Sequence, residues 1–435
     1  MADFKNELLE LALKRGCDAA EVYCSKSENF DVNIRNGEID EYSVSGNAGI
    51  SLRVVYNGHD GFASTESFDD AETLVKRAMD NAQTVDSEDE HPMQGKSEYR
   101  ELKSPDSQLR HMSERERIDR GFELDKLLLA SDKRVKRTER CRISCSESCV
   151  ELLNTCGLDA SYTSGSTMAI VGVVMEENGE EKVGYAFGFD KKTDDLKALV
   201  DEAVKNCASA FGASPVPSGK YKILFKNKTF CDMLELFGGV FSAYAAQKGL
   251  SKLAGREGDI IASECVTLCD DPFNEVCPIP FDSEGVPTMY KNVIENGKLV
   301  TLLHSLKTAK TAGCASTGNG TRTGACSNTN LYIKPGEKSF EELLQGERVL
   351  VISSVEGAGT GVNEVSGEFS LSASGELYEN GRRVKSVNQI TVAGSFFDLL
   401  KNIEAVGSDL EFTSPSGMGF MGSPSVLVKE LMISG

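Results

Sequence analysis

Three cysteines spaced four residues apart are the first residues of this sequence that could do chemistry, because thiolates bind zinc. Cys141, Cys145 and Cys149 would stack on one face of a helix, but the residues around them alternate between apolar and polar, as in a strand. Four residues of a strand advance about 13 Å, and two sulfurs at that separation cannot both lie about 2.3 Å from one ion. We therefore predict core cysteines here, and the same geometry separates Cys265 from Cys269.

The four histidines form no local pair that could bind a metal or act in catalysis. His59, His91, His111 and His304 are widely separated in the sequence. Only the fold could bring them together, so we interpret them as surface or singly hydrogen-bonded side chains. A nucleophilic pair of a thiol with His304 stays open, because such partners are often distant in sequence.

Acidic and glycine-rich strings are the remaining chemical candidates. Asp270-Asp271 and the string 282–288 gather carboxylates that could bind a cation or a peptide amine, although a solvated turn is the simpler interpretation. The segments 316–321 and 356–361 are rich in glycine, but neither has the Gly-Lys-Ser/Thr ending of a phosphate loop. We interpret these two segments as turns or places where two backbones approach closely.

The elements that position these residues predict an α+β fold. The Asn-Gly pairs at 36–37, 57–58, 178–179, 296–297 and 380–381, a signal for type I′ turns, indicate antiparallel hairpins along the whole chain. The helical patterns are too few for regular βαβ alternation, and one of them, over 229–253, predicts a long helix. Two prolines and a glycine within 214–219 indicate a boundary between an N-terminal α+β domain, 1–213, and a β-rich C-terminal domain with antiparallel sheets, 220–435. Within the first domain, the polar stretch of about 86–120 is interpreted as an exposed excursion.

Composition narrows the functional classes. The 435 residues include 47 Lys+Arg and 67 Asp+Glu, which gives a formal charge of −20. That charge repels phosphate backbones and anionic lipids, so we expect no direct nucleic-acid partner and no membrane partner. The sequence has no apolar run long enough to span a bilayer and no signal-peptide core, and its 13 scattered cysteines differ from a disulfide framework. We expect a cytoplasmic protein.

Short strings over nearly the whole chain resemble the family of TldD and TldE (also called PmbA), often labelled modulators of DNA gyrase. They occur in the family's order, which makes the resemblance specific. In the N-terminal half they are Gly16-Cys17-Asp18-Ala19-Ala20-Glu21-Val22, Arg35-Asn36-Gly37-Glu38-Ile39 and Gly61-Phe62-Ala63-Ser64-Thr65. In the C-terminal half they are Ala246-Gln247-Lys248-Gly249-Leu250-Ser251, Leu253-Ala254-Gly255, Asp270-Asp271, Phe281-Asp282-Ser283-Glu284-Gly285-Val286-Pro287-Thr288, Ile294-Glu295-Asn296-Gly297-Lys298-Leu299, Ser316-Thr317-Gly318-Asn319-Gly320 and Gly367-Glu368-Phe369-Ser370-Leu371-Ser372.

The resemblance also shows where this chain departs from the family's zinc motif. TldD-like members carry His-Glu-x-x-x-His on a helix, and a later cysteine completes their metal site. Alignment places Leu234 and Gly239 at the two histidine positions and keeps only Glu235, and no cysteine follows Cys326. The resemblance therefore implies a TldE/PmbA-like subunit with no metal, no cofactor and no catalytic residues of its own.

The family also implies partners and a cleft. We expect a dimer with a TldD-like metallopeptidase subunit, which would hold the zinc, or a homodimer, acting on peptides or unfolded segments. Candidate cleft or interface residues are Asp282, Glu284, Gly318, Asn319 and Gly320. Two other functions remain open: a cysteine-dependent hydrolase, and a peptide-binding homodimer without catalysis.

Overall fold

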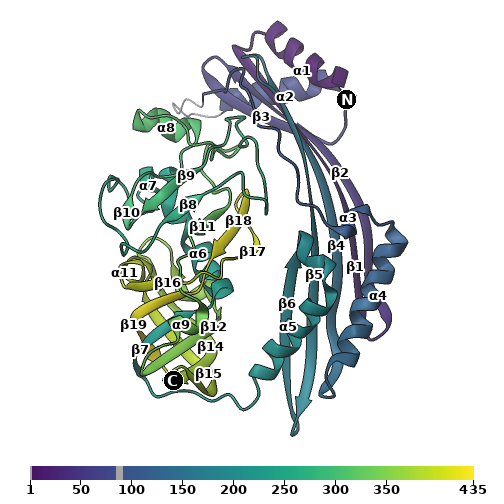
Figure 1. Cartoon of the computed structure of the whole chain (residues 1–435). Helices are drawn as coiled ribbons and strands as arrows, with labels where there is room; N and C mark the ends of the chain where they lie inside the picture. The colour runs from purple at the N-terminus through teal and green to yellow at the C-terminus, as the bar shows by residue number, and fades with distance from the viewer. Residues whose placement is uncertain (1, 85–91) are drawn as a thin grey trace.

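One antiparallel sheet of six strands, in the order β3-β2-β1-β4-β5-β6, forms the N-terminal half of the chain. The computed structural model describes residues 2–84 and 92–435 (Figure 1). All five predicted Asn-Gly turns join antiparallel neighbours, and their asparagines have φ between 47° and 52°. The strands of this sheet are β1 (Ala19–Arg35), β2 (Glu38–Tyr56), β3 (His59–Thr65), β4 (Val135–Asn154), β5 (Asp159–Glu177) and β6 (Glu180–Phe189).

Helices cover this sheet and bury its apolar residues. Cys141 and Cys145 of β4 lie in the core under α4 (Glu114–Ser131) and α5 (Leu196–Ser209), as the alternating pattern predicted, whereas Cys149 is only partly buried. At the other end of the sheet, α1 (Ala2–Lys14) and α2 (Ala71–Thr84) cover a second core (Figure 1). The remaining elements of this half are α3 (Gln108–His111) and the 3-10 helix η1 (Asp190–Asp194).

The polar stretch 86–120 is less exposed than its composition indicated. Residues 86–91 lie outside the described residues. Further along, Ser107 and Leu109 are buried, because the backbone runs across the sheet and the Ser107 hydroxyl shares a hydrogen bond with Thr167. The helix α4 then begins at Glu114, where Ser113 and Glu116 form a capping box.

The C-terminal half is rich in strands, which confirms the predicted α+β class. A mostly antiparallel sheet has the order β10-β9-β8-β11-β18-β17, and a second has the order β12-β7-β19-β15-β14-β13, with β14 also paired to β12. The strands are β7 (Gly219–Phe225), β8 (Leu268–Asp270), β9 (Lys291–Glu295), β10 (Lys298–Leu299), β11 (Leu331–Ile333), β12 (Arg348–Glu356), β13 (Val362–Asn363), β14 (Glu368–Glu379), β15 (Arg382–Ser395), β16 (Ile403–Val406), β17 (Glu411–Ser416), β18 (Gly419–Ser423) and β19 (Val426–Ser434).

The helix predicted over 229–253 is wrong in its extent. The α-helix α6 covers only Asn227–Phe237, and the 3-10 helix η2 (Gly238–Phe241) follows it. Two successive glycines weaken a helix, and the Ser242 hydroxyl then caps a new one by accepting a hydrogen bond from Ala245 N. The other helices are α7 (Ala243–Gln247), α8 (Leu306–Ala312), α9 (Phe340–Leu343), α10 (Ala358–Gly361) and α11 (Phe396–Lys401).

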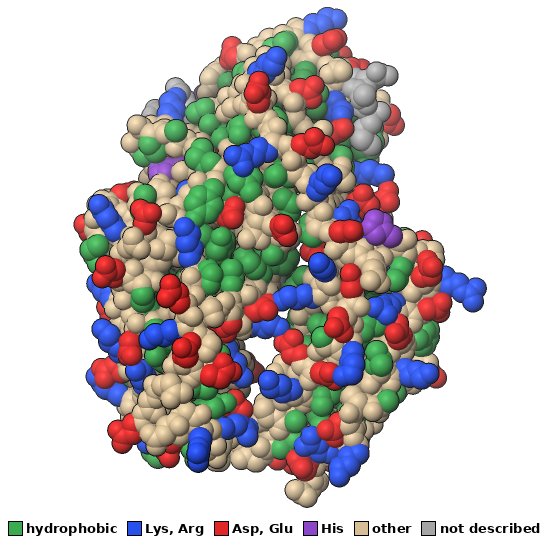
Figure 2. Space-filling model, in the orientation of Figure 1, with side chains coloured by type: hydrophobic (Ala, Val, Ile, Leu, Met, Phe, Trp, Pro, Cys, Tyr) green, Lys and Arg blue, Asp and Glu red, His purple; other side chains and the backbone are tan. Residues whose placement is uncertain are grey.

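The two halves form two lobes, which contact each other between Tyr99 and Phe281, between Phe189 and Phe420 and between Glu202 and Lys228. Residues 210–218 link α5 to β7 without forming a helix or strand. The domain boundary predicted there stays an interpretation. Figure 2 shows an opening between the lobes below their contact. Within residues 2–84 and 92–435, no helix is long and apolar enough to cross a membrane.

Candidate functional site

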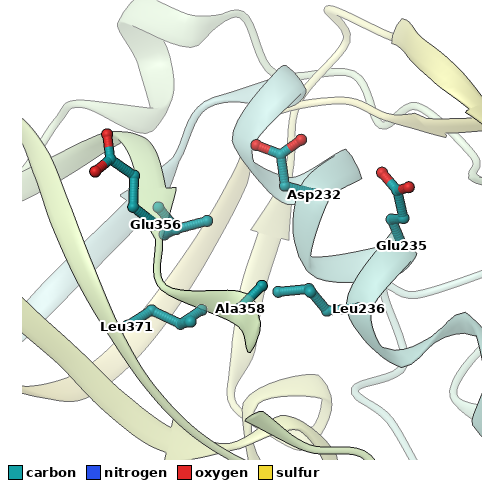
Figure 3. Close-up of a pocket in the computed structure, with 7 residues that line it drawn as sticks. Asp232, Glu235, Leu236, Glu356, Ala358 and Leu371 are labelled. Carbon is teal, nitrogen blue, oxygen red and sulfur yellow. The ribbon is translucent and has the colours of Figure 1, made fainter. Parts of the chain in front are cut away.

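A cavity of about 300 Å³ lies beside α6, where the family's zinc motif aligns. Asp232 and Glu235 from α6 line one side of it, and Glu356 at the end of β12 lines the other (Figure 3). Leu236, Val355, Ala358 and Leu371 complete the lining. The cavity thus combines three carboxylates with an apolar wall.

The charge of Glu235 acts on Asp232 because the two residues lie about one turn apart on α6. Burial, and then the charge of Glu235, raise the pKa of Asp232 to about 6. Among the described residues no donor is hydrogen-bonded to the Asp232 carboxylate, so its charge is poorly compensated near neutral pH.

The residues at the aligned motif do not fit a zinc site. Leu234 is fully buried in the C-terminal core and does not line the cavity. Gly239 has no side chain, and Glu235 is the one aligned residue of a type that binds metals. Across residues 2–84 and 92–435, no group of three His, Cys, Asp or Glu side chains is placed to hold a metal ion.

A second candidate site is the loop pair that carries the predicted cleft residues. Asp282 is 1% exposed, and its carboxylate accepts hydrogen bonds from the backbone N–H groups of Glu284, Val286 and Gly320. This single side chain therefore joins the loop 282–288 to the loop 316–320. Burial raises the pKa of Asp282 to about 7, although the three N–H groups act in the opposite direction.

Glu284 connects the same loops to α8. Its Oε2 accepts a hydrogen bond of 2.7 Å from Leu306 N, at the start of that helix. A Cβ at Gly320 would lie only 2.0 Å from the same oxygen, so the carboxylate needs glycine there. Burial, and then the charge of Asp282, raise the pKa of Glu284 to about 8.

Gly318 and Asn319 are equally enclosed. Gly318 has φ of +70°, and a Cβ there would lie 2.8 Å from Pro287 O. Asn319 is fully buried and hydrogen-bonded to Asp270 and to Lys291. The structure thus brings all five predicted cleft residues together, and it places them in an internal loop junction.

The two lobes also touch at this loop junction. The Phe281 ring lies 5.0 Å from the rings of Tyr99 and Tyr162, measured between centroids, and Tyr99 donates a hydrogen bond to Gly285 O. Close by, Arg322 pairs with the buried Glu21 of β1. The string that carries Asp282 and Glu284 therefore takes part in the contact between the lobes.

Among the described residues, no cysteine is hydrogen-bonded to His304, the pair that was left open as an alternative. His304 is buried, and its Nδ1 has no hydrogen-bond partner among the described residues. Burial lowers the pKa of this ring. The neighbouring Ser305 N donates a hydrogen bond to Cys326 Sγ. Catalysis by this pair stays a prediction.

Comparison with known sequences decides the family. Residues 218–435, half of the chain, match the profile described as the PmbA/TldA metallopeptidase C-terminal domain. The chain belongs to the PmbA/TldD family. Residues 20–82 and 107–209 match the same family's domain 1 and central domain. The family resemblance predicted from short strings is thereby confirmed.

Individual relatives agree over nearly the full length. The metalloprotease PmbA of Escherichia coli O157:H7 is 27% identical, over 98% of this chain and 94% of that protein. A Thermotoga maritima structure, named for modulation of a DNA gyrase, is 32% identical with a TM-score of 0.92 and covers both chains completely. TldE from Thermococcus kodakarensis, at 23% identity and a TM-score of 0.89 over 99% of this chain and 100% of that one, has the same fold.

Sequence reasoning missed two of the three acidic residues that line the cavity. Asp232 precedes Glu235 by three residues, so helical spacing alone would have placed both on one face of α6. Glu356 begins the glycine-rich segment 356–361 that was interpreted only as a turn. No local pattern links β12 to α6, because their contact depends on the order of strands in the sheet.

Proposed function

We propose that this chain is the TldE/PmbA-like companion subunit of a two-chain zinc metallopeptidase and does not itself bind the metal. One observation carries the proposal: leucine and glycine stand at both histidine positions of the family motif, and Leu234 is packed in the core. Neither residue offers an atom that binds zinc. Glu235 therefore has no metal-bound water to act on as a base.

The expected partner is a TldD-like chain that carries the complete motif and the zinc. Support comes from the loops of this junction, which keep the family strings although the motif is lost and are joined to each other and to α8 by hydrogen bonds. Such a partnership needs a lasting interface, which typically buries about 2,000 Å² or more. Substrates of the pair would be peptides or unfolded segments. A cytoplasmic location is supported by the thirteen cysteines, all of which are free thiols.

Metal content tests the companion role directly. The chain is purified without chelator, incubated with zinc, desalted and measured by elemental analysis. A TldD-like chain treated in the same way is the control and should retain about one zinc, because its motif is complete. We expect far less than one zinc in this chain, and about one zinc per chain would contradict the proposal.

A double variant separates the lost histidines from the rest of the site. Leu234→His with Gly239→His restores both imidazoles but not the third ligand or the groups that orient them. We expect weak zinc binding and no peptide cleavage. Cleavage by this variant alone would show that the chain still holds a complete active site.

A further inference from the structure

A buried lysine, aspartate and asparagine meet on three separate segments of the C-terminal lobe. Lys291 of β9 is 9% exposed, whereas Asp270 of β8 and Asn319 of the loop 316–320 are fully buried. Lys291 Nζ lies 2.9 Å from Asp270 Oδ2 and 2.9 Å from Asn319 Oδ1. Asn319 Nδ2 in turn lies 2.8 Å from Asp270 Oδ2. Each of the three side chains therefore touches the other two.

This arrangement contains the parts of an acyl-transfer site. The amine of Lys291 is a nucleophile and lies beside the side-chain amide of Asn319. The Asp270 carboxylate contacts both Lys291 Nζ and Asn319 Nδ2. Asn319 Oδ1 accepts a hydrogen bond from a second donor besides Lys291. That donor is the Thr317 hydroxyl, 2.8 Å from Asn319 Oδ1, where negative charge would develop during attack. Thr329 N donates to the other oxygen of Asp270 and fixes the carboxylate. Holding reactants in contact removes much of the entropic barrier to such a reaction.

We propose that Lys291 and Asn319 form an intramolecular isopeptide bond, with Asp270 as the proton carrier. A bond forms between Lys291 Nζ and Asn319 Cγ, the bond between Cγ and Nδ2 breaks, and the amide nitrogen leaves as ammonia. The reaction needs no oxidant, reductant or other co-reactant. It is independent of the peptidase role proposed above.

The protons balance through Asp270. The carboxylate first takes a proton from the Nζ ammonium, which leaves a neutral amine and a carboxylic acid. As the amine attacks Cγ, the acid passes its proton to Nδ2. It then takes a second proton from Nζ while the C=O bond re-forms and ammonia departs, so that the amide product and a neutral Asp270 remain.

Burial favours the end of this sequence. The product replaces the lysine and asparagine side chains by one neutral amide. Water has little access to fully buried atoms and cannot readily reverse the step by hydrolysis.

The bond would have a structural consequence for the loop junction. It would tie β9 to the loop 316–320, the loop that Asp282 and Glu284 hold against α8. A covalent tie between residues 291 and 319 restricts the unfolded chain in the way a disulfide does, without depending on redox conditions.

Mass spectrometry of the denatured full chain tests the proposal. We expect an intact mass lower than the sequence mass by one ammonia, after the state of the N-terminal methionine is assigned. An intact mass equal to the sequence mass would overturn the proposal. Because the wild-type protein is measured, the result does not depend on any variant folding.

Peptide mapping distinguishes the isopeptide bond from another loss of ammonia. A succinimide at an Asn-Gly pair, including Asn319-Gly320, has the same mass change but links no peptides. After trypsin digestion we expect one branched species that joins the peptide 311–322 to the peptide containing Lys291, with no cleavage after Lys291. Ammonia loss confined to one unbranched peptide would overturn the proposal.

Variants test the role of each group. Lys291→Arg should restore the full sequence mass, and Asp270→Asn should leave Lys291 and Asn319 unlinked. The matched control is Lys298→Arg, an exposed lysine on the neighbouring strand β10, which should keep the branched peptide. A branched peptide that persists in Asp270→Asn would refute the carrier role, and ammonia loss that persists in Lys291→Arg would refute the bond.

Discussion

Replacing Glu284 by glutamine should change how the stability of this protein depends on pH. The pKa of Glu284 rises from 4.5 to about 8 in the folded chain, because the side chain is buried beside Asp282. Each pH unit between these values corresponds to about 1.4 kcal/mol, so ionising Glu284 costs on the order of 5 kcal/mol more in the folded state than in the unfolded chain.

The sign of the effect follows from proton counts. Between pH 4.5 and about 8 the folded protein keeps the Glu284 proton and the unfolded chain has lost it. The free energy of unfolding therefore falls as pH rises through this window, and the loss is complete above pH 8. Glutamine stays neutral and still offers an oxygen to Leu306 N. The free energy of unfolding of the variant therefore lacks this dependence on pH.

Urea unfolding of both proteins at pH 5, 7 and 9 measures the difference. We expect similar stability at pH 5 and a Glu284→Gln variant that is more stable by several kcal/mol at pH 9. Glu430→Gln is the matched control, since that carboxylate is exposed and paired with Lys220 at the surface. Parallel curves for wild type and Glu284→Gln, or a variant that is less stable at pH 9, would refute the reasoning.

Three further predictions concern the lobe contact and the thiols. Gly318→Ala should lower stability by about 2–4 kcal/mol in denaturant unfolding, because alanine meets both a positive φ and the Pro287 backbone; a change below about 0.5 kcal/mol would contradict this. Tyr99→Phe keeps the ring contact with Phe281 and loses the hydrogen bond to Gly285 O, so a loss of about 1 kcal/mol is expected, and no change would argue against a role of that bond. Titration with a thiol reagent should modify the three exposed cysteines, Cys156, Cys265 and Cys314, rapidly and the seven buried ones only in denaturant; fast reaction of a buried thiol would instead favour the cysteine-hydrolase alternative.

Local sequence patterns were sufficient for much of the fold. The Asn-Gly pairs predicted hairpins because both central residues of a type I′ turn need positive φ, and alternation around Cys141 predicted a buried strand. Strand length was harder to predict. The long strand β1 has a polar middle, which local patterns do not mark as a strand and which pairing with β2 and β4 holds on both sides.

The sequence identified several residues of the candidate sites but did not show what those residues do in the structure. The strings around Asp282 and Asn319 were recognisable, yet only tertiary structure shows that they bond to each other and that the first contacts the N-terminal lobe. The cluster of Lys291, Asp270 and Asn319 joins residues from three segments, and no spacing rule connects them. Likewise, Glu356 reaches the cavity beside α6 through sheet topology, which the sequence does not encode locally.

Reconstitution of peptidase activity tests the companion-subunit proposal most directly. This chain, a TldD-like chain and an equimolar mixture are incubated with an unfolded peptide, with and without a chelator. We predict that this chain alone is inactive, and that the mixture cleaves the peptide, loses activity with chelator and regains it with zinc. Robust cleavage by this chain alone that is insensitive to chelator would contradict the account.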